Sequence, residues 1–281
     1  MAGGAKTKIA STVTARQQDA VNRAVYAMPG VYRHYLDAHL EPAEAVCLLK
    51  YQPHLAGRDV LDVGVGAGRT TRYLAALARH YEAIDYSPVM VAYMRQTFPA
   101  VSVRHEDFRD LQSFADGSFD FLFATNNVID ALSHEDRLRA LRETFRVLRP
   151  GGIIAFSSHN ARYLGAYRGP RLEWCRNPIT LAANVGRLLL RWRNHLRVGR
   201  LRDITPDYAL LNDEGHDYAC LHYYVTRATA QAQLASVGLQ LIEVFDEQGR
   251  TIPGSADDSA CPNLLYVAAR LAEPPSAMAL S

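Results

Sequence analysis

A glycine-rich turn is the feature of this sequence that most restricts its fold. Gly64, Gly66 and Gly68 follow a short apolar run at 59–63 and precede a helical pattern that continues through Leu77. Glycine in a strand-to-helix turn lets the backbone bend sharply and lets a ligand approach without meeting a Cβ. The first N–H groups of the helix beyond it have no partner within the helix. The turn therefore predicts a ligand site at the carboxyl end of the first strand of an α/β sheet.

Apolar runs and helical patterns alternate along the chain after this turn. Further strands are predicted at 81–84, 101–103, 119–124, 153–156, 239–245 and 264–269. Helices are predicted between them, including one over 135–148 and one that ends at Gly238. This alternation is typical of an α/β fold with a doubly wound, mostly parallel sheet, and the last two strands suit an antiparallel edge pair.

The length of 281 residues fits one core domain with an elaboration. The first helix is predicted to start at Thr14, which has capping-box spacing to Gln17, and helical stretches are predicted at 31–39 and 42–50. The α/β rhythm breaks after the fifth strand, where one helical pattern appears near 178–197. The expected parts are a disordered N-terminus at 1–13, N-terminal cap helices at 14–55, a core at 56–159 and 223–271, an inserted cap at 160–222, and a tail at 272–281.

The composition argues against several classes of protein. A formal net charge of +2 does not indicate a nucleic-acid-binding protein, so nucleic acid is not an expected partner. No apolar run approaches the roughly 20 residues of a membrane span, and the N-terminus has no signal-peptide pattern. The four cysteines are scattered without paired spacing, so neither a disulfide framework nor a metal site is expected. We expect a cytoplasmic protein that is a monomer or a homodimer.

The details of the glycine turn separate it from two common nucleotide-binding loops. A dinucleotide fingerprint needs glycine at position 69, where this chain has Arg69, and no Gly-Lys-Ser/Thr of a phosphate loop is present. Asp62 stands two residues before the first glycine and can face the cationic amino-acid end of a ligand. Asp85 ends the next strand and can accept hydrogen bonds from both hydroxyls of a ribose. Asp107 follows the third strand and can accept one from an adenine amino group.

Aspartate also caps turns in many proteins, so each acid alone is ambiguous. Taken together, the motifs resemble those of the class I, Rossmann-like S-adenosylmethionine-dependent methyltransferases. Asp62-x-Gly64-x-Gly66-x-Gly68 is similar to the first motif of that family, and Ile84-Asp85-Tyr86-Ser87-Pro88-x-Met90 to the second. Glu106-Asp107 resembles the adenine-binding acid, Ser118-Phe119-Asp120 opens the likeness to the fourth motif, and Leu148-Arg149-Pro150-Gly151-Gly152 resembles the turn before the fifth strand.

The resemblance covers roughly 55–160 and 226–270. It implies S-adenosylmethionine as cofactor and S-adenosylhomocysteine as product. It also implies a seven-stranded, mostly parallel sheet with an antiparallel C-terminal strand and a helical lid insertion. The cofactor-binding residues expected from it are Asp62, Gly64, Gly66, Gly68, Asp85, Tyr86, Met90, Asp107, Phe108 and Asn126.

Two residues near strand ends are candidates for catalysis. Asn126 follows the fourth strand, where the family brings cofactor and acceptor together, although it also suits a simple strand-ending turn. His159 follows the fifth strand and suits a general base, or else a hydrogen bond to a loop backbone. Candidates for an acceptor pocket beneath the insertion are Tyr163, His216, His222, Tyr223 and Tyr224, which alternatively pack the cap onto the sheet.

An arginine-rich stretch inside the insertion is left without a role. Seven arginines and no acid lie between Arg176 and Arg202, and apolar residues at helical spacing accompany them. The pattern indicates a basic amphipathic helix, which suits an anionic acceptor, a membrane surface, RNA or a solvated cap face.

The function that the sequence predicts is methyl transfer from S-adenosylmethionine to an oxygen or nitrogen of a small molecule, such as a natural-product intermediate or a glycan precursor. Two alternatives remain at this point. One is an NAD-dependent oxidoreductase on a related fold, and the other is a methyltransferase-like protein that binds the cofactor without turnover.

Overall fold

The computed structural model describes residues 3–26, 28 and 39–272, with the backbone alone for 3–14. Five parallel strands form the centre of its sheet in the order β3-β2-β1-β4-β5. Their bounds are β1 Asp59–Val63, β2 His80–Asp85, β3 Ser102–His105, β4 Phe119–Ala124 and β5 Leu148–Asn160. Beyond β5 lie β10 (Asn263–Arg270) and then β9 (Leu239–Phe245), and β10 runs antiparallel to both neighbours. The predicted fold class is confirmed.

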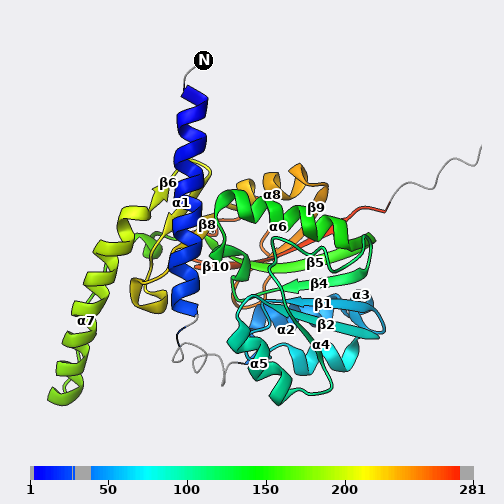
Figure 1. Cartoon of the computed structure of the whole chain (residues 1–281), viewed down its shortest axis with the longest axis horizontal. Coiled ribbons are helices and arrows are strands. Elements are labelled where there is room, and N and C mark those ends of the chain that lie inside the picture. Colours follow the sequence, from blue (N-terminus) through cyan, green and yellow to red (C-terminus); the bar gives the residue numbers. More distant parts are fainter. Residues whose placement is uncertain (1–2, 27, 29–38, 273–281) are drawn as a thin grey trace, which may run out of the picture.

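Helices cover both faces of this sheet (Figure 1). Because successive side chains of a strand point to opposite faces, β4 places Phe121 and Phe123 in one core and Leu122 and Ala124 in the other. The first core includes side chains of α2, α3 and α4, and the second includes side chains of α6 and α8. The bounds are α2 Pro42–Lys50, α3 Gln52–Leu55, α4 Thr71–Leu77, α5 Pro88–Thr97, α6 His134–Val147 and α8 Arg227–Ser236.

The insertion extends the sheet, which the sequence did not predict. It contains α7 (Pro178–Val198) and three short strands, β6 Asp203–Ile204, β7 Tyr208–Leu211 and β8 His222–Val225. β8 pairs in parallel with the end of β5, β7 runs antiparallel to β8, and β6 forms the edge, so the described sheet has ten strands rather than seven. Short 3₁₀ helices occur at Val128–Ala131, Leu164–Tyr167, Gly199–Leu201 and Gly215–Tyr218.

The N-terminal helix α1 spans Gly3–Tyr26, so it begins before Thr14, where the sequence predicts a helix start. The disordered segment at 1–13 stays a prediction. The residues there include no proline, and alanine and lysine favour a helix. The predicted helix at 31–39 and tail at 272–281 lie almost wholly outside the described residues. None of the helices in the described part of the chain combines the length and apolarity needed to cross a membrane.

One buried asparagine fastens α1 to the rest of the molecule. The Asn22 side-chain amide donates to the carbonyl oxygens of Ala131 at 3.0 Å and Leu221 at 2.8 Å, and its oxygen accepts from the Leu221 N–H at 2.9 Å. Leu221 lies immediately before β8, so the same side chain connects α1, the loop after β4 and the insertion.

We expect Asn22→Ala to destabilise the protein, because it leaves the buried N–H and C=O groups of Leu221 without these partners. Each unsatisfied buried group costs roughly 1–3 kcal/mol. Urea denaturation of the variant and of Gln17→Ala, which removes an exposed amide from the same helix, measures the difference. Equal free energies of unfolding for the two variants would contradict this role of Asn22.

Candidate functional site

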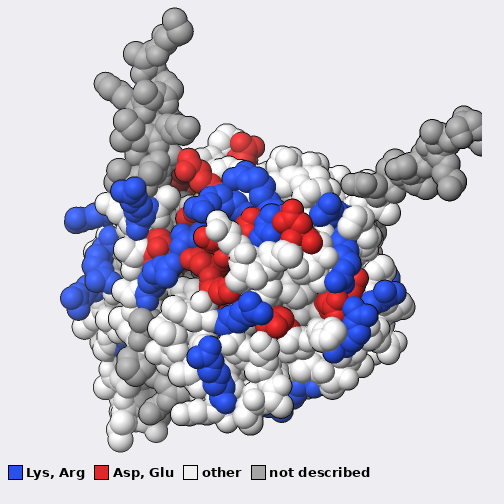
Figure 2. Space-filling model, turned by 45° about the vertical axis from the view of Figure 1, so that its right-hand side comes forward, with Lys and Arg blue, Asp and Glu red and all other residues white. Residues whose placement is uncertain are grey.

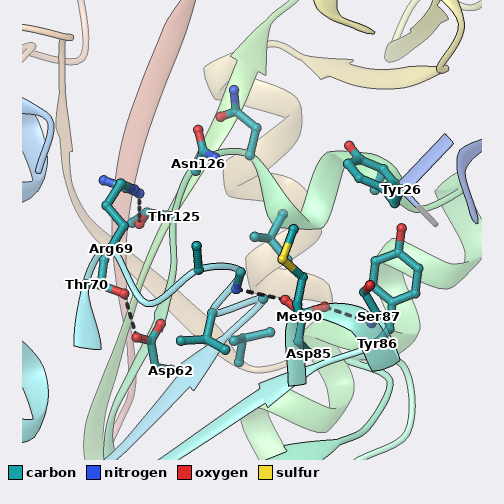
Figure 3. Close-up of a pocket in the computed structure, with 18 residues that line it drawn as sticks. Tyr26, Asp62, Arg69, Thr70, Asp85, Tyr86, Ser87, Met90, Thr125 and Asn126 are labelled. Carbon is teal, nitrogen blue, oxygen red and sulfur yellow. Dashed lines mark hydrogen bonds between the residues drawn. The ribbon is translucent and has the colours of Figure 1, made fainter. Parts of the chain in front are cut away.

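The glycine turn forms the floor of a cleft at the carboxyl ends of β1, β2 and β4 (Figure 3). Gly64, Gly66 and Gly68 have φ values of +68°, +55° and +81°, which glycine adopts without strain. A Cβ on Gly64 would come within 2.5 Å of Val128 across the cleft. Gly66 has open space beside it and, like Gly64, lines the cleft.

Gly68 has a different role from the one predicted for it. It does not line the cleft, and a Cβ there would approach Phe98 to 2.5 Å and Met94 to 2.7 Å. Its lack of a side chain therefore allows the turn to pack on α5, rather than allowing a ligand to approach.

Asp85 points into the cleft from the end of β2 (Figure 3). Its carboxylate accepts hydrogen bonds from the N–H groups of Gly66 and Ser87, both at 2.8 Å. Burial raises the pKa of this carboxyl, while these two hydrogen bonds oppose the shift. Tyr86 and Met90, the other two residues predicted from the second motif, line the same cleft.

Asp62 lies at the opposite end of the cleft. One of its carboxylate oxygens accepts hydrogen bonds from the Thr70 hydroxyl at 2.6 Å and the Tyr81 hydroxyl at 2.7 Å. Burial raises the pKa of the Asp62 carboxyl to about 6, against the effect of these hydrogen bonds. Beside it, the guanidinium of Arg69 forms a buried ion pair with Glu44 of α2 and also donates to Thr125 at 3.4 Å.

Asp107 and Phe108 line a continuation of the cleft beneath α1. Burial favours a raised pKa for Asp107, but hydrogen bonds and charge from Arg109 outweigh it and keep the pKa below its ordinary value. Arg23 of α1 also donates to the Asp107 carboxylate, at 2.8 Å. Asp107 thus lines the cleft, and its carboxylate accepts hydrogen bonds from both Arg23 and Arg109.

The cleft contains buried polar atoms that no protein group satisfies. The Tyr86 hydroxyl, the Ser87 hydroxyl and one carboxylate oxygen of Glu106 have no hydrogen-bond partner among the described residues. Buried polar groups are normally paired, so these atoms indicate a polar ligand. Acids at both ends, a glycine floor and apolar Met90 between them fit a ligand that carries an ammonium group, a ribose and an adenine.

Asn126 and Asn127 form the rim of the cleft after β4. Both have positive φ, at 57° and 58°, a conformation that asparagine tolerates better than most residues. Asn127 donates its side-chain amide to Nε2 of His159 at 3.2 Å and to Asn263 at 2.9 Å. The rim therefore connects the cleft to the second predicted catalytic residue.

His159 forms a histidine–carboxylate dyad with Asp130. Its Nδ1 lies 2.7 Å from Oδ2 of Asp130, and its backbone N–H donates to the same oxygen at 2.7 Å. A carboxylate accepts hydrogen bonds, so the proton of the neutral ring is held at Nδ1 and Nε2 carries the lone pair. Asp130 and Arg137 are fully buried, and Arg137 donates to the other carboxylate oxygen at 2.6 Å.

A second cavity of about 390 Å³ lies on the far side of His159, beneath the insertion. Its lining includes Tyr163, His222 and Tyr224, and their role in binding an acceptor stays a prediction. The His222 ring stacks on that of His159 with centroids 5.2 Å apart, and its Nδ1 lies 2.9 Å from Asp213. Burial lowers the pKa of His222, but the nearby Asp213 carboxylate outweighs this and raises it.

Two predicted pocket residues lie elsewhere. Tyr223 points to the opposite face of β8, where its hydroxyl contacts His134 at 2.7 Å and accepts from Gln233 at 2.8 Å. Neighbouring residues of a strand face opposite sides, so it cannot share the pocket of Tyr224. His216 lies on a turn with φ 49°, packs against Tyr26 and His222, and lines neither cavity.

Sequence reasoning missed Asp130, Arg137, Asp213 and the Arg69–Glu44 pair. Only the position of Asp130 gave a signal, since it follows Asn126-Asn127 at the end of β4. The others pair with residues 7 to 25 positions away, and only the folded chain brings these partners into contact.

Comparison with known proteins agrees with this geometry. Residues 60–152 match the sequence profile of a methyltransferase domain. A probable S-adenosylmethionine-dependent methyltransferase of Mycolicibacterium smegmatis is 38% identical over 105 residues, which are 37% of this chain and 39% of that protein. A malonyl-[acyl-carrier protein] O-methyltransferase of Pectobacterium atrosepticum is 33% identical over 143 residues, 50% of this chain and 53% of that protein. The chain thus spans about two fifths to half of these curated relatives.

A solved structure shares the fold over most of the chain. It is the 1,6-didemethyltoxoflavin-N1-methyltransferase of Burkholderia thailandensis with bound 1,6-didemethyltoxoflavin and S-adenosylhomocysteine, with a TM-score of 0.58 and 13% identity. The similarity covers 92% of this chain and 90% of that one. At this identity the likeness concerns the fold alone.

The raised pKa of Asp62 predicts a pH dependence of stability. The two limits are pH 3.8, the ordinary pKa of the carboxyl, and about pH 6, its pKa in the folded chain. Between them the Asp62 carboxyl is ionised in the unfolded chain and protonated in the folded chain. The contribution of Asp62 to the free energy of unfolding therefore falls as pH rises through this window, by on the order of 2–3 kcal/mol, and is constant above it.

Urea denaturation across this pH range compares the protein with Asp62→Asn, which cannot titrate, and with Asp110→Asn, which removes an exposed carboxylate. We expect the free energy of unfolding of Asp62→Asn, minus that of the unmodified protein, to increase with pH. The free energy of unfolding of Asp110→Asn should have the same pH dependence as that of the unmodified protein. A constant difference for Asp62→Asn would show that Asp62 ionises normally.

Proposed function

We propose that this chain, a member of the class I S-adenosylmethionine-dependent methyltransferases, transfers a methyl group from S-adenosylmethionine to an oxygen or nitrogen of a small-molecule acceptor, and that a hydroxyl is the acceptor its side chains serve best. The observation that carries the proposal is the Asp130–His159 dyad, whose histidine lines the cavity beneath the insertion and contacts Asn127 at the rim of the cofactor cleft. The O-methyltransferase of Pectobacterium atrosepticum among the relatives supports the preference for oxygen.

The cleft residues have complementary roles toward the cofactor. Asp85 accepts hydrogen bonds from the ribose hydroxyls, because a carboxylate has more acceptor sites than Gly66 and Ser87 occupy. Asp62 faces the ammonium group, which favours the ionised form of its carboxyl. Asp107 accepts from the adenine amino group, and Phe108 lines the apolar wall beside it.

S-adenosylmethionine supplies a methyl group that its sulfonium already activates. The protein therefore mainly has to orient the acceptor and exclude water, and orientation alone can account for roughly 7–11 kcal/mol of a barrier. A hydroxyl must also lose its proton as it becomes an ether, and Nε2 of His159 can take it when the acceptor hydroxyl replaces the Asn127 amide as the donor to its lone pair. Asp130 stabilises the resulting imidazolium, while the rings of His222 and Tyr224 keep the imidazole from rotating.

The two alternatives from the sequence are less well supported. The position that a dinucleotide fingerprint reserves for glycine is Arg69, whose ion pair with Glu44 holds α2 against the turn, and this disfavours an NAD-dependent oxidoreductase. A protein that binds the cofactor without turnover has no need of an oriented histidine–carboxylate dyad. Measurement of turnover distinguishes it from an enzyme.

Asp85→Asn tests the cofactor site. The amide retains the shape of the carboxylate and loses its charge, and hydrogen bonds to a charged group contribute roughly 1.5–3 kcal/mol each. We expect the affinity for S-adenosylhomocysteine, measured by calorimetry, to fall at least tenfold. Asp116→Asn, which changes an exposed carboxylate outside the cleft, should bind with unchanged affinity. Equal affinities of Asp85→Asn and Asp116→Asn would mean that the ribose binds elsewhere.

His159→Gln tests the proposed base. Candidate acceptors with hydroxyl or amino groups are first screened by the S-adenosylhomocysteine that they release. With a hydroxyl acceptor, kcat should then fall by roughly 10²–10⁴-fold while cofactor affinity stays the same. His54→Gln changes an exposed histidine and serves as the control. An unaltered kcat in His159→Gln would refute a base at this position.

A further inference from the structure

We propose that α7 lies flat on the headgroup region of a membrane and is a docking surface for anionic lipid. This inference concerns the insertion and does not depend on the proposed methyl transfer. It accounts for the arginine-rich stretch that neither the cleft nor the dyad uses. Figure 1 shows α7 at the periphery of the molecule, projecting beyond the edge of the sheet.

Three polar side chains on one face of α7 contact the rest of the protein. Arg187 and Arg191 both pair with Asp217, at 2.9 and 2.8 Å, and Arg191 also pairs with Glu173 at 2.5 Å. Further along the same face, Asn194 donates to the Asp217 carbonyl oxygen. These contacts fix which side of the helix faces inward.

The opposite face exposes a continuous row of apolar side chains. Val185, Leu189, Trp192 and Leu196 recur at helical spacing, with exposed fractions of 42%, 67%, 42% and 63%. Trp174, just before the helix, is 70% exposed. Soluble proteins rarely expose such contiguous apolar surface, and its occurrence on a helix indicates an interaction site.

Arginines border this apolar row, and they differ from those on the inner face. Arg193, Arg197 and Arg200 are exposed and form no ion pair within the described part of the chain. No acid occurs between Arg176 and Arg202, whereas basic and acidic side chains are interspersed on the face shown in Figure 2. Leucine and tryptophan with flanking arginines is the composition of helices that lie in a membrane interface, where arginine pairs with anionic headgroups.

Charge disfavours a second copy of the chain as the occupant. Two α7 helices packed through their apolar rows would bring unpaired arginines of the same sign together, with no acid on either helix to compensate. An anionic lipid surface both supplies the missing negative charge and accommodates the apolar row. The cavity beneath the insertion is lined by Leu172, Glu173 and Arg191 of the same segment.

Intrinsic fluorescence provides a direct test, because both tryptophans of the chain, Trp174 and Trp192, belong to this segment. The full chain is mixed with vesicles of phosphatidylcholine alone, or of phosphatidylcholine with an equal amount of phosphatidylglycerol. We expect flotation with the anionic vesicles only, and a shift of the emission to shorter wavelength. The shift should persist in Trp174→Phe, in which Trp192 is the sole reporter.

Substitutions distinguish the apolar and the charged contributions. The triple variant Arg193→Gln, Arg197→Gln, Arg200→Gln should lose affinity roughly a hundredfold, since each arginine near an anionic surface contributes about fivefold. Leu189→Ser with Leu196→Ser should lose at least tenfold. Matched controls are the exposed triple variant Arg58→Gln, Arg72→Gln, Arg142→Gln and the exposed Leu49→Ser, and both should bind as the unmodified chain does.

Three results would overturn the proposal. One is an absence of vesicle binding by the unmodified chain. Another is self-association in sedimentation that Leu189→Ser abolishes, which would assign the face to a second copy. The third is preferential binding of an RNA oligonucleotide that the arginine variant loses and the leucine variant retains. All variants should bind S-adenosylhomocysteine normally, which verifies that they are folded.

Discussion

The buried carboxylate of Asp130 is the interaction on which the geometry of the site depends. It accepts hydrogen bonds from Arg137 of α6 and from Ser158 and His159 of β5, so its acceptor sites are filled from two elements. An isolated charge in this core would cost several kcal/mol, and each partner therefore requires the others. The Arg137 guanidinium in turn lies over the ring of Tyr223 on β8. The orientation of the His159 imidazole thus depends on the same contacts that join the insertion to the core.

The parts of the fold that follow from local signals could be predicted from the sequence. β1, β4 and β9 have the predicted bounds because each is a short, mainly apolar segment that ends at a turn or a polar residue. The acids of the cleft could also be predicted, because the carboxyl ends of parallel strands meet at one edge and Asp62 and Asp85 each lie at such an end. Gly68 shows the limit of a motif, since the pattern of glycines does not distinguish a ligand contact from a packing contact.

The features that escaped prediction depend on long-range partners. Both faces of β8 are buried, so polar and apolar residues do not alternate along it. The sequence pattern of His222–Tyr224 therefore indicates a cluster and not a strand. Recognition of that strand would have separated Tyr223 from its two neighbours at once. Asp213 becomes significant only where β7 brings the following loop beside His222, and Glu44 only where α2 packs over Arg69. No spacing within the sequence encodes these pairs.

Helix α1 connects the two cavities through adjacent residues. Arg23 donates to Asp107 in the cofactor cleft, and Asn22 is bonded to Leu221 at the start of β8, which carries His222 and Tyr224. Arg23 shares the Asp107 carboxylate with Arg109, so an adenine amino group that binds there must share it too. Helix α1 therefore contacts both the cofactor cleft and the strand that carries His222 and Tyr224, although the sequence pattern only partly indicated this helix.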